Sequence, residues 1–459
     1  MPNDSPAMAK SMTQTSRPAS AAPHAIAIPT QGLSWGLLFL LSTLIIYGVY
    51  QSHYNINIGI PGVNPLNLVF LLAWGATLAL PSEREVKIPL RGSFFLLFAT
   101  MVWGLLIGEM QDTSQVGNDF IALKDDIFYP LYYFLFFRAV RGMRGIRMIF
   151  AVLLCTGFLV AVEGVRQALD YGLFHYKESA RVSGPFGASS ASNIASAYYA
   201  SILPLFVSVA IFRKSHPWQR IFAVGCSFLV IFATFYTYSR QAYFIEALVL
   251  LLMVMRRHKI LAIILVSVIS LTYQLWLPDT VLQRIDMTEQ VNSSGAVTLD
   301  ASTESRLVIW AGAMHMLADH PLGVGLNHFH RLLHQYLPEL PVADAHNFYV
   351  LFTTETGPLG LLVLVLLVVN LLRMARNVEK IGNGEISSIL GQGFTASTIA
   401  IILSNLYGSR LLNGDMMLSY WVFAAICARY LVLARQPAEA TPERGVNAYS
   451  RPMAPQGRT

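Results

Sequence analysis

The sequence predicts an all-α polytopic membrane protein with about twelve transmembrane helices. Three observations carry this prediction. Hydrophobic residues make up 54% of the chain and charged residues only 13%, which is about half the charged share of a typical soluble domain. Apolar blocks of roughly twenty residues, the length that a helix needs to cross a bilayer, recur along the chain. The basic residues behind the formal net charge of +6 stand in short clusters between these blocks, so nucleic acid is not an expected partner.

Twelve segments are apolar enough to be predicted as spans. In chain order they are 33–50, 64–80, 92–109, 127–140, 148–165, 194–212, 221–238, 241–255, 260–278, 347–372, 388–407 and 416–434. The segment 127–140 is short for a span, because a helix rises about 1.5 Å per residue and the hydrocarbon core is about 30 Å thick. A long connection at 279–345 separates helices one to nine, within 32–278, from helices ten to twelve, within 346–434.

The two ends of the chain are predicted to be disordered cytoplasmic tails. Residues 1–31 are dominated by Ser, Thr, Pro and Ala, and residues 435–459 are also polar. The first apolar run starts near Leu33 and no small-residue cleavage site clearly follows it, so a signal peptide is not expected.

The positions of Lys and Arg predict the orientation in the membrane. With the first tail inside, the twelve spans place 23 of the 32 Lys and Arg residues on the inner side and nine on the outer side. Cytoplasmic loops carry an excess of these residues. Both termini are therefore predicted to be cytoplasmic, and the connection 279–345 is predicted to face the outside.

The connection 279–345 is too long for a plain turn, and it contains two predicted amphipathic helices. In each of them apolar residues recur at helical spacing. They are Leu307, Trp310, Ala311, Met314 and Leu317 in the first, and Leu326, Phe329, Leu333, Tyr336 and Leu337 in the second. Two such helices are expected to lie over the outer surface of the bundle and to roof a cavity.

Three motifs lie in or beside the predicted outer loops. The first is Tyr238-Ser-Arg240, a tight hairpin between two spans. The second is Arg306-Leu-Val-Ile-Trp310 in the first loop helix, followed by Pro321-Leu-Gly-Val-Gly325. The third is His346-Asn347 at the start of the tenth span, leading to Glu355-Thr-Gly-Pro-Leu-Gly360. The Gly-Pro pair of this last motif is predicted to kink the span, because proline removes a helical hydrogen bond.

In this order and with this topology, the motifs resemble those of the O-antigen ligase and O-antigen polymerase superfamily of bacterial membrane glycosyltransferases. The resemblance implies a metal-independent enzyme of the inner membrane whose active site faces the periplasm. It implies a glycan donor on undecaprenyl diphosphate, with no nucleotide sugar and no other cofactor. The acceptor would be lipid A-core or a growing glycan. Twelve spans with the main loop before the tenth are more similar to the ligases of lipopolysaccharide assembly, and polymerisation of an O-antigen or exopolysaccharide is the alternative.

The chemistry of such a transfer predicts roles for particular residues. A departing diphosphate gathers negative charge, and arginine binds phosphate oxygens through two parallel hydrogen bonds. Arg240 and Arg306 are therefore predicted to bind the diphosphate, with Arg181 as a third positive group. His346 is predicted to be the base that activates the acceptor hydroxyl, because a neutral imidazole accepts a proton near neutral pH.

Two more residues are predicted to bind substrate, and the main candidates also have structural explanations. Asn347 is predicted to orient the imidazole or a sugar, and Trp310 to contact substrate. Arg240 could instead be an interfacial arginine that reaches towards water, and Arg306 a solvated charge on a loop helix. His346 could simply cap the tenth span. Glu355 is about 13 Å from His346 at helical rise and is expected to pair with a polar group inside the bundle.

No metal site is predicted. Cys155, Cys226 and Cys427 are far apart in apolar segments, so neither a disulfide framework nor a zinc knuckle is expected. His330 and His334 lie one helical turn apart and could bind a metal, but solvated helix faces explain them better, since the chain has no HExxH motif.

Two other classes of function are alternatives to a glycosyltransferase. A transporter or flippase for polysaccharide precursors would also have about twelve spans, and it predicts inverted repeats and charges near the midplane. The sequence has no clear repeat. Glu163 and Glu246 could serve in a proton relay, although a structural hydrogen bond explains each equally well. The third class is a non-catalytic scaffold of an envelope-polysaccharide complex.

Overall fold

The computed structural model describes most of residues 33–436. Residues outside this description are 1–32, 55, 57–58, 60–63, 82, 84–85, 112–113, 174–175, 278, 287–288, 292–296, 300, 340–343, 383 and 437–459. The two predicted tails therefore lie outside the described residues, except for Arg435 and Gln436 at the end of the last helix.

The described part of the chain is almost entirely helical. Its α-helices are α1 (Trp35–Tyr54), α2 (Pro65–Leu78), α3 (Arg91–Gly108), α4 (Val116–Phe128), α5 (Leu131–Ala139), α6 (Met143–Tyr171), α7 (Ser192–Phe212), α8 (Pro217–Tyr236), α9 (Arg240–Arg257), α10 (Lys259–Trp276), α11 (Asp279–Asp286), α12 (Ala301–Asp319), α13 (Phe329–Tyr336), α14 (Phe348–Ile381), α15 (Glu385–Ser404) and α16 (Gly414–Arg435). Short 3₁₀ turns are η1 (Glu178–Ala180), η2 (Gly184–Phe186), η3 (Ser189–Ala191) and η4 (Arg410–Leu412). A small antiparallel hairpin of β1 (Glu289–Val291) and β2 (Val297–Leu299) pairs Gln290 with Thr298.

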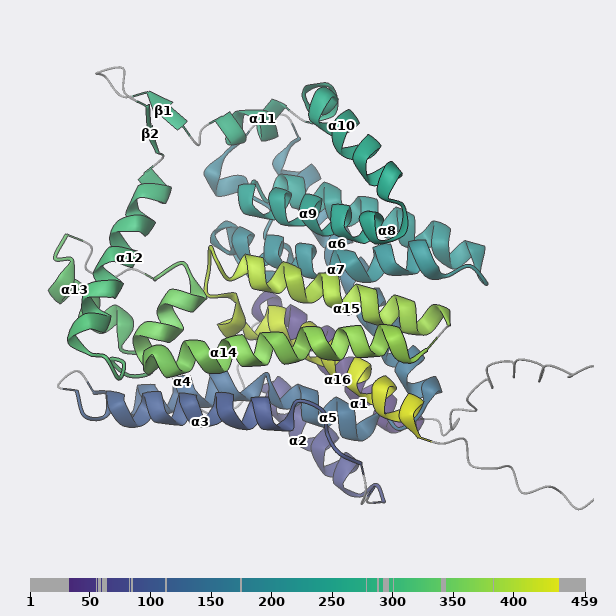
Figure 1. The fold of residues 1–459 in the computed structure, drawn as a ribbon, viewed down its shortest axis with the longest axis horizontal. Helices are drawn as coiled ribbons and strands as arrows, with labels where there is room; N and C mark the ends of the chain where they lie inside the picture. Colours follow the sequence, from purple (N-terminus) through teal and green to yellow (C-terminus); the bar gives the residue numbers. More distant parts are fainter. Residues whose placement is uncertain are drawn as a thin grey trace, which may run out of the picture.

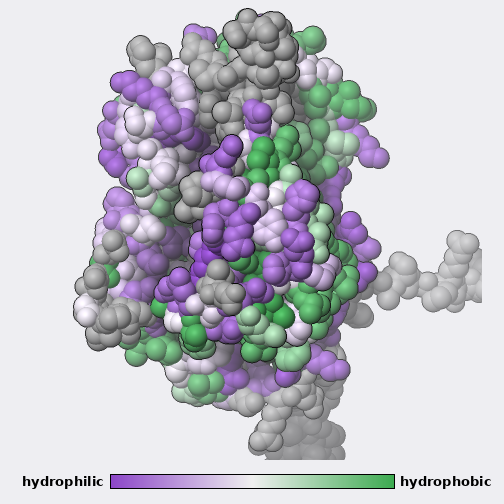
Figure 2. Space-filling model, turned by 90° about the vertical axis from the view of Figure 1, so that its left-hand side faces the viewer, coloured by the Kyte–Doolittle hydropathy of each residue, from purple (hydrophilic) through white to green (hydrophobic). Residues whose placement is uncertain are grey.

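The long helices run side by side, and α12 and α13 pack across one end of them (Figure 1). We call this end of the molecule the loop end. Seen from the loop end, hydrophilic residues cover the upper left and the middle of the face, and hydrophobic residues gather on its right-hand and lower sides (Figure 2). This distribution is the one expected where a membrane bundle meets water.

Eight of the described helices are long and apolar enough to cross a membrane. They are α1, α3, α6, α7, α8, α14, α15 and α16. The helix α2 and the middle of α10 are apolar but shorter. The protein is therefore a multi-pass membrane protein. The count of about twelve spans stays a prediction.

The predicted span 127–140 does not form a single helix. It covers the junction between α4, which ends at Phe128, and α5, which begins at Leu131. Pro130 lies in this junction, and its missing N–H cannot continue the hydrogen bonding of α4. The prediction of one continuous helix here was therefore wrong. The nine-residue helix α5 is largely buried in the bundle.

The helices α7 and α16 form the centre of the bundle. In the most apolar 18-residue stretch of each helix, 83% of the residues of α7 and 94% of those of α16 are buried. The corresponding share is 33–39% for α1, α3, α6, α8 and α14. The outer helices expose large apolar side chains, such as Phe39 on α1 and Phe95 on α3. A lipid bilayer would cover these side chains, so the exposed apolar surface agrees with a membrane location.

The long helix α14 is interrupted at the predicted position. Gly357 has φ 75° and ψ 177°, which confirms the kink expected beside Pro358. Pro358 has no N–H to donate to the carbonyl of Thr354. This carbonyl and that of Glu355 instead accept hydrogen bonds from Val324 and Gly325, at 2.9 and 3.0 Å. The segment 321–328, which we call the latch, is thereby bonded into the break in α14.

Two glycines allow the latch to approach so closely. A Cβ atom on Gly323 would lie 2.5 Å from the carbonyl oxygen of Glu355, and one on Gly325 would lie 2.2 Å from the Cα of Gly108 on α3. Both glycines also have a positive φ, of 99° and 106°. Only glycine fits either position, because other residues would add both a clash and backbone strain. Residues 321–325, from the second motif, and residues 355–360, from the third, therefore pack against each other at the break in α14.

Both predicted loop helices are present, but the buried face predicted for the first was wrong. In α12 the buried apolar side chains are Ile309, Ala313 and Met316, whereas Leu307 and Met314 are at least half exposed. The small residues Gly312 and Ala313 let α12 approach the chain after α13, where Leu337 contacts Gly312. Close packing therefore favoured the face with small side chains over the face with the largest ones.

The helix α13 is held by an ion pair to α4. Asp119 is fully buried and accepts hydrogen bonds from Arg331 and, at 3.1 Å, from the side-chain amide of Asn327. Burial alone would raise the pKa of this carboxyl, but the bonds from Arg331, the Gln115 N–H and Asn327 outweigh it and lower the pKa below its ordinary value. Asp119 is therefore charged at neutral pH and fixes α13 to α4.

Candidate functional site

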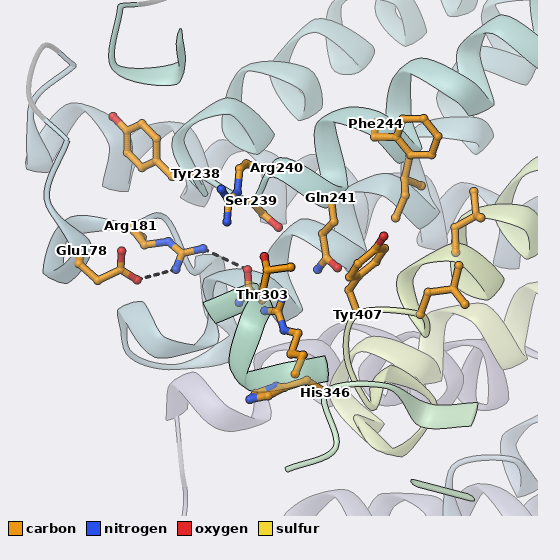
Figure 3. Close-up of a pocket in the computed structure, with 15 residues that line it drawn as sticks. Glu178, Arg181, Tyr238, Ser239, Arg240, Gln241, Phe244, Thr303, His346 and Tyr407 are labelled. Atoms are coloured by element: carbon orange, nitrogen blue, oxygen red, sulfur yellow. Dashed lines mark hydrogen bonds and ion pairs between the residues drawn. The ribbon is translucent and has the colours of Figure 1, made fainter. Parts of the chain in front are cut away.

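A cavity of about 800 Å³ opens at the loop end of the bundle (Figure 3). Its wall comes from five parts of the chain: the loop before α7 with the first turn of α7, the junction of α8 and α9 with the start of α9, the start of α12, the segment just before α14, and the end of α15 with the residues after it. The lining residues are Glu178, Arg181, Asn193, Tyr238, Ser239, Arg240, Gln241, Phe244, Ile245, Thr303, Arg306, His346, Leu403, Leu406 and Tyr407.

Four residues selected from the sequence meet at this cavity. They are Arg181, Arg240, Arg306 and His346, and they are separated by up to 165 residues along the chain. Figure 3 shows Arg240 and His346 on opposite sides of the cavity. The fold thus brings three arginines and one histidine around a space large enough for a small-molecule substrate.

The tight hairpin between α8 and α9 positions Arg240. Tyr238 adopts a left-handed conformation, with φ 52°, and its side chain is buried. Its N–H donates to the carbonyl of Phe235 at 3.1 Å, so the chain turns directly from α8 into α9. Arg240 is the first residue of α9, and its side chain therefore leaves from the turn of the hairpin.

Arg181 connects the loop before α7 to the same hairpin. Its guanidinium donates to the carbonyl of Thr237 at 2.9 Å, to Glu178 at 2.8 Å and to the side chain of Asn193 at 3.0 Å. The N–H of Val182 adds a backbone bond to Tyr236 at 2.9 Å. Arg181 thus fixes the cavity wall, and Glu178 offsets part of its charge.

His346 stands just before α14 with a left-handed backbone, φ 47°. Its side chain is 49% exposed, and its Nδ1 lies 3.6 Å from a carboxylate oxygen of Asp344. Burial lowers the pKa of the imidazole below its ordinary value; Asp344 opposes this shift, while Arg306 and Arg410 add to it. The ring is therefore mainly neutral at neutral pH, as a proton acceptor must be.

Arg410 and Asp344 are two residues beside the site that sequence reasoning did not select. Arg410 is buried in η4, and burial lowers its pKa to about 10, with Arg306 adding to the effect and Asp344 opposing it. Ser409 donates to Asp344 at 3.1 Å, which joins the loop after α15 to the residues before α14. Arg410 was among the nine outer-side basic residues, so the charge distribution contained a signal for it.

Asn347 and Trp310, which were predicted to bind substrate, do not line the cavity. Asn347 caps α14, because its side-chain oxygen accepts from the N–H groups of Tyr349 and Val350 at 2.9 and 3.2 Å. The indole of Trp310 donates to the carbonyl of Ala345 at 2.8 Å. Both side chains hold the backbone on either side of His346. Asn347 therefore provides the helix cap that was the alternative role for His346.

Three acidic residues inside the helices, Glu355, Glu246 and Glu163, have polar partners. Glu355 is buried and accepts from the N–H of Phe329 at 3.4 Å, which agrees with the expected polar partner inside the bundle. Glu246 accepts from the hydroxyl of Thr234 at 2.7 Å, and Glu163 pairs with Arg166. Within the described residues, no group of three or more His, Cys, Asp or Glu side chains is arranged to hold a metal ion.

A comparison with family models and known proteins adds to this geometry. Residues 223–365 match the model of the O-antigen ligase family. No curated protein matches the chain. The matched segment contains Arg240, Arg306 and His346, whereas Arg181 lies before it. The match supports the resemblance predicted from the motifs, and over residues 223–365 the chain is similar to the O-antigen ligase family.

Proposed function

We propose that this protein is a glycosyltransferase of the bacterial inner membrane. It transfers a glycan from undecaprenyl diphosphate to an acceptor hydroxyl on the periplasmic side, in the manner of an O-antigen ligase. One observation carries the proposal: Arg240, Arg306 and His346 come from separate segments and line one cavity, which Arg181 completes.

The lining of the cavity suits a polyprenyl diphosphate. Arg240 and Arg306 provide the positive charge that a diphosphate requires. Phe244 lies one helical turn beyond Arg240 on α9, and Leu403 and Leu406 line the cavity from the end of α15. The surface thus changes from cationic to apolar, as a ligand with a charged head and a prenyl chain requires.

In the proposed reaction, the oxygen of the acceptor hydroxyl forms a bond to the anomeric carbon of the glycan. The bond from that carbon to the diphosphate oxygen breaks, and its electron pair leaves with the diphosphate. Arg240 and Arg306 stabilise the negative charge that develops there. Nε2 of His346 accepts the hydroxyl proton, while Nδ1 faces Asp344. The arginines supply the positive charge, so the step needs no metal ion.

Ligation and polymerisation share this donor chemistry and differ in the acceptor. We propose ligation to lipid A-core because the loop before the tenth predicted span is similar to the layout of the ligases. Deletion of the gene, with separate analysis of lipopolysaccharide and secreted polysaccharide, tests this choice. We expect uncapped lipopolysaccharide and accumulation of free lipid-linked polymer. Single repeat units on the carrier would identify a polymerase, and unchanged glycans would contradict both functions.

The proposed orientation places the cavity on the periplasmic side, which thiol labelling tests directly. The variant Ala318→Cys introduces an exposed probe on α12, in a background without Cys155, Cys226 and Cys427. A membrane-impermeant reagent should label it in cells whose inner membrane is intact. The control Lys214→Cys, between α7 and α8, should react only after that membrane is permeabilised. The reverse pattern would contradict the orientation.

A further inference from the structure

A second hollow of about 630 Å³ lies at the end of the bundle opposite to the loop end. Its wall comes from the start of α3, the second half of α14 and the end of α16. The lining residues are Lys87, Ile88, Pro89, Leu90, Gly92, Ser93, Leu96, Leu366, Asn370, Arg373, Met374, Asn377, Leu431, Val432 and Arg435. We call this hollow the inner groove.

The position of the inner groove follows from α14, which passes both hollows. His346 stands just before the start of α14 and Arg373 lies 27 residues further along the chain. At about 1.5 Å per residue this separation is about 40 Å, which exceeds the hydrocarbon thickness of about 30 Å. The cavity and the inner groove therefore lie at opposite ends of the bundle, where a bilayer around the bundle would have its two surfaces.

The inner groove is cationic, and none of its described lining residues is a carboxylate. Lys87, Arg373 and Arg435 contribute positive charges from three different segments. Arg373 donates to the side chain of Asn370 at 3.4 Å, and Asn370 donates to the buried hydroxyl of Ser93 at 2.9 Å. The bond from Asn370 to Ser93 links α14 to α3, and the bond from Arg373 lies within α14 at the polar floor of the groove.

Apolar residues continue the groove towards the membrane interior. Leu366 lies seven residues before Arg373, about 10 Å nearer the middle of α14, and its side chain is exposed. Leu96 stands beside it on α3, also exposed, and Leu431 closes the wall from α16. A general excess of basic residues at a membrane surface explains the charges but not this hollow with a polar floor and apolar walls.

We infer that the inner groove binds an anionic phospholipid. Its phosphate-bearing head group would contact Lys87, Arg373 and Arg435, and its acyl chains would lie along Leu96 and Leu366. A soluble anion such as inorganic phosphate would contact only the basic residues and would leave the apolar walls uncovered. The apolar walls favour the lipid. This inference does not depend on the transfer reaction, because the inner groove shares no residue with the cavity.

Native mass spectrometry of the full chain in detergent tests the inference, with phosphatidylglycerol or phosphatidylcholine added. The test variant combines Lys87→Gln, Arg373→Gln and Arg435→Gln. Each basic residue near a charged lipid surface contributes about 1 kcal/mol, so we expect retention of phosphatidylglycerol to fall by about a hundredfold, with little change for phosphatidylcholine. Millimolar inorganic phosphate should not displace the bound lipid.

A second triple variant serves as the matched control. Arg147→Gln, Arg376→Gln and Lys380→Gln remove the same charge from the same end of the bundle without touching the groove lining. This variant should retain phosphatidylglycerol within about twofold of the unmodified chain. Equal loss in both variants, no loss in the test variant, or displacement by inorganic phosphate would overturn the inference. If the triple variant does not fold, Arg373→Gln alone should still lower retention by about fivefold.

Discussion

The cavity and the latch both lie at the loop end and both contain motif residues, but they use them in different ways. The cavity is built from charged side chains, with Arg240, Arg306 and His346 on its wall. The latch is built from backbone, with the N–H groups of Val324 and Gly325 bonded to carbonyls freed by the break in α14. Residues of one motif therefore serve two purposes, and only some of them can take part in chemistry.

This difference predicts two separable kinds of defect. A substitution of Arg240, Arg306 or His346 should reduce transfer and leave the fold intact, because these side chains line a hollow and none of them is fully buried. A substitution in the latch should reduce the amount of folded protein, because a clash there separates α3, α14 and the loop from one another. Activity and stability measured on the same variants distinguish the two.

The largest expected effect on transfer comes from Arg240→Lys and Arg306→Lys. Lysine keeps the positive charge but loses the planar fork that binds two phosphate oxygens at once. Removing one such group from a site of developing charge reduces rates by about 10²–10³-fold, and we expect a loss of this size in each variant. Transfer from the lipid-linked donor in proteoliposomes measures it, and thermal unfolding should be unchanged.

Arg166→Lys is the matched control for these two variants. Arg166 lies on the outer side in the predicted topology, is bonded to Glu163 and Asp170, and does not line the cavity. Its replacement should leave transfer within about twofold, since its ion pairs are solvent-exposed and contribute little. Near-normal transfer in Arg240→Lys would remove bidentate phosphate binding from the proposed mechanism.

The next effect is on folding and comes from Gly325→Ala. The added Cβ would lie 2.2 Å from the Cα of Gly108, and a positive φ of 106° adds backbone strain. Strain of this kind costs on the order of 1–3 kcal/mol before the clash is counted, so we expect a clearly lower unfolding temperature and yield. Gly117→Ala on α4 is the control, because nothing lies within 4 Å of its added Cβ. Equal stability of both variants would contradict the close approach at the latch.

The smallest effect is a shift in the pH dependence of transfer. The pKa of His346 is below its ordinary value of 6.5, so the rate should be constant near neutral pH and should fall only as the pH drops through this lowered pKa. Asp344 raises that pKa, so Asp344→Asn should lower it further and move the acid limb to lower pH. A pH–rate profile measures the shift. An acid limb that stays in place, or moves to higher pH, would show that Asp344 does not act on the base.

The sequence was sufficient for the parts of the fold that depend on short-range physics. Apolar length predicted the membrane helices, and Gly357-Pro358 predicted the kink because proline cannot donate the helical hydrogen bond. The grouping of Arg240, Arg306 and His346 was accessible because outer-side cations are unusual in a membrane protein. These signals are local in the sequence or rest on a simple electrostatic bias.

What the sequence did not predict depends on packing between distant segments. Trp310 was expected at the substrate, yet its indole bonds to the carbonyl of Ala345, a contact that exists only once α12 lies against the start of α14. The buried face of α12 was also misjudged, because close approach of small residues outweighed the burial of Met314. Arg410 has no motif around it, and only the fold brings it near His346.

The proposed mechanism requires that His346 accepts the proton of the acceptor hydroxyl in this cavity. The most direct measurement is transfer by His346→Gln together with binding of the lipid-linked donor, with His315→Gln on the exposed side of α12 as control. Glutamine can hydrogen-bond a hydroxyl but cannot accept its proton, and general-base catalysis contributes about 10²–10⁴-fold. We predict that His346→Gln binds the donor normally and loses transfer by at least about a hundredfold, while His315→Gln is unaffected. Near-normal transfer by His346→Gln would contradict the claim, and His346 would then only position the acceptor.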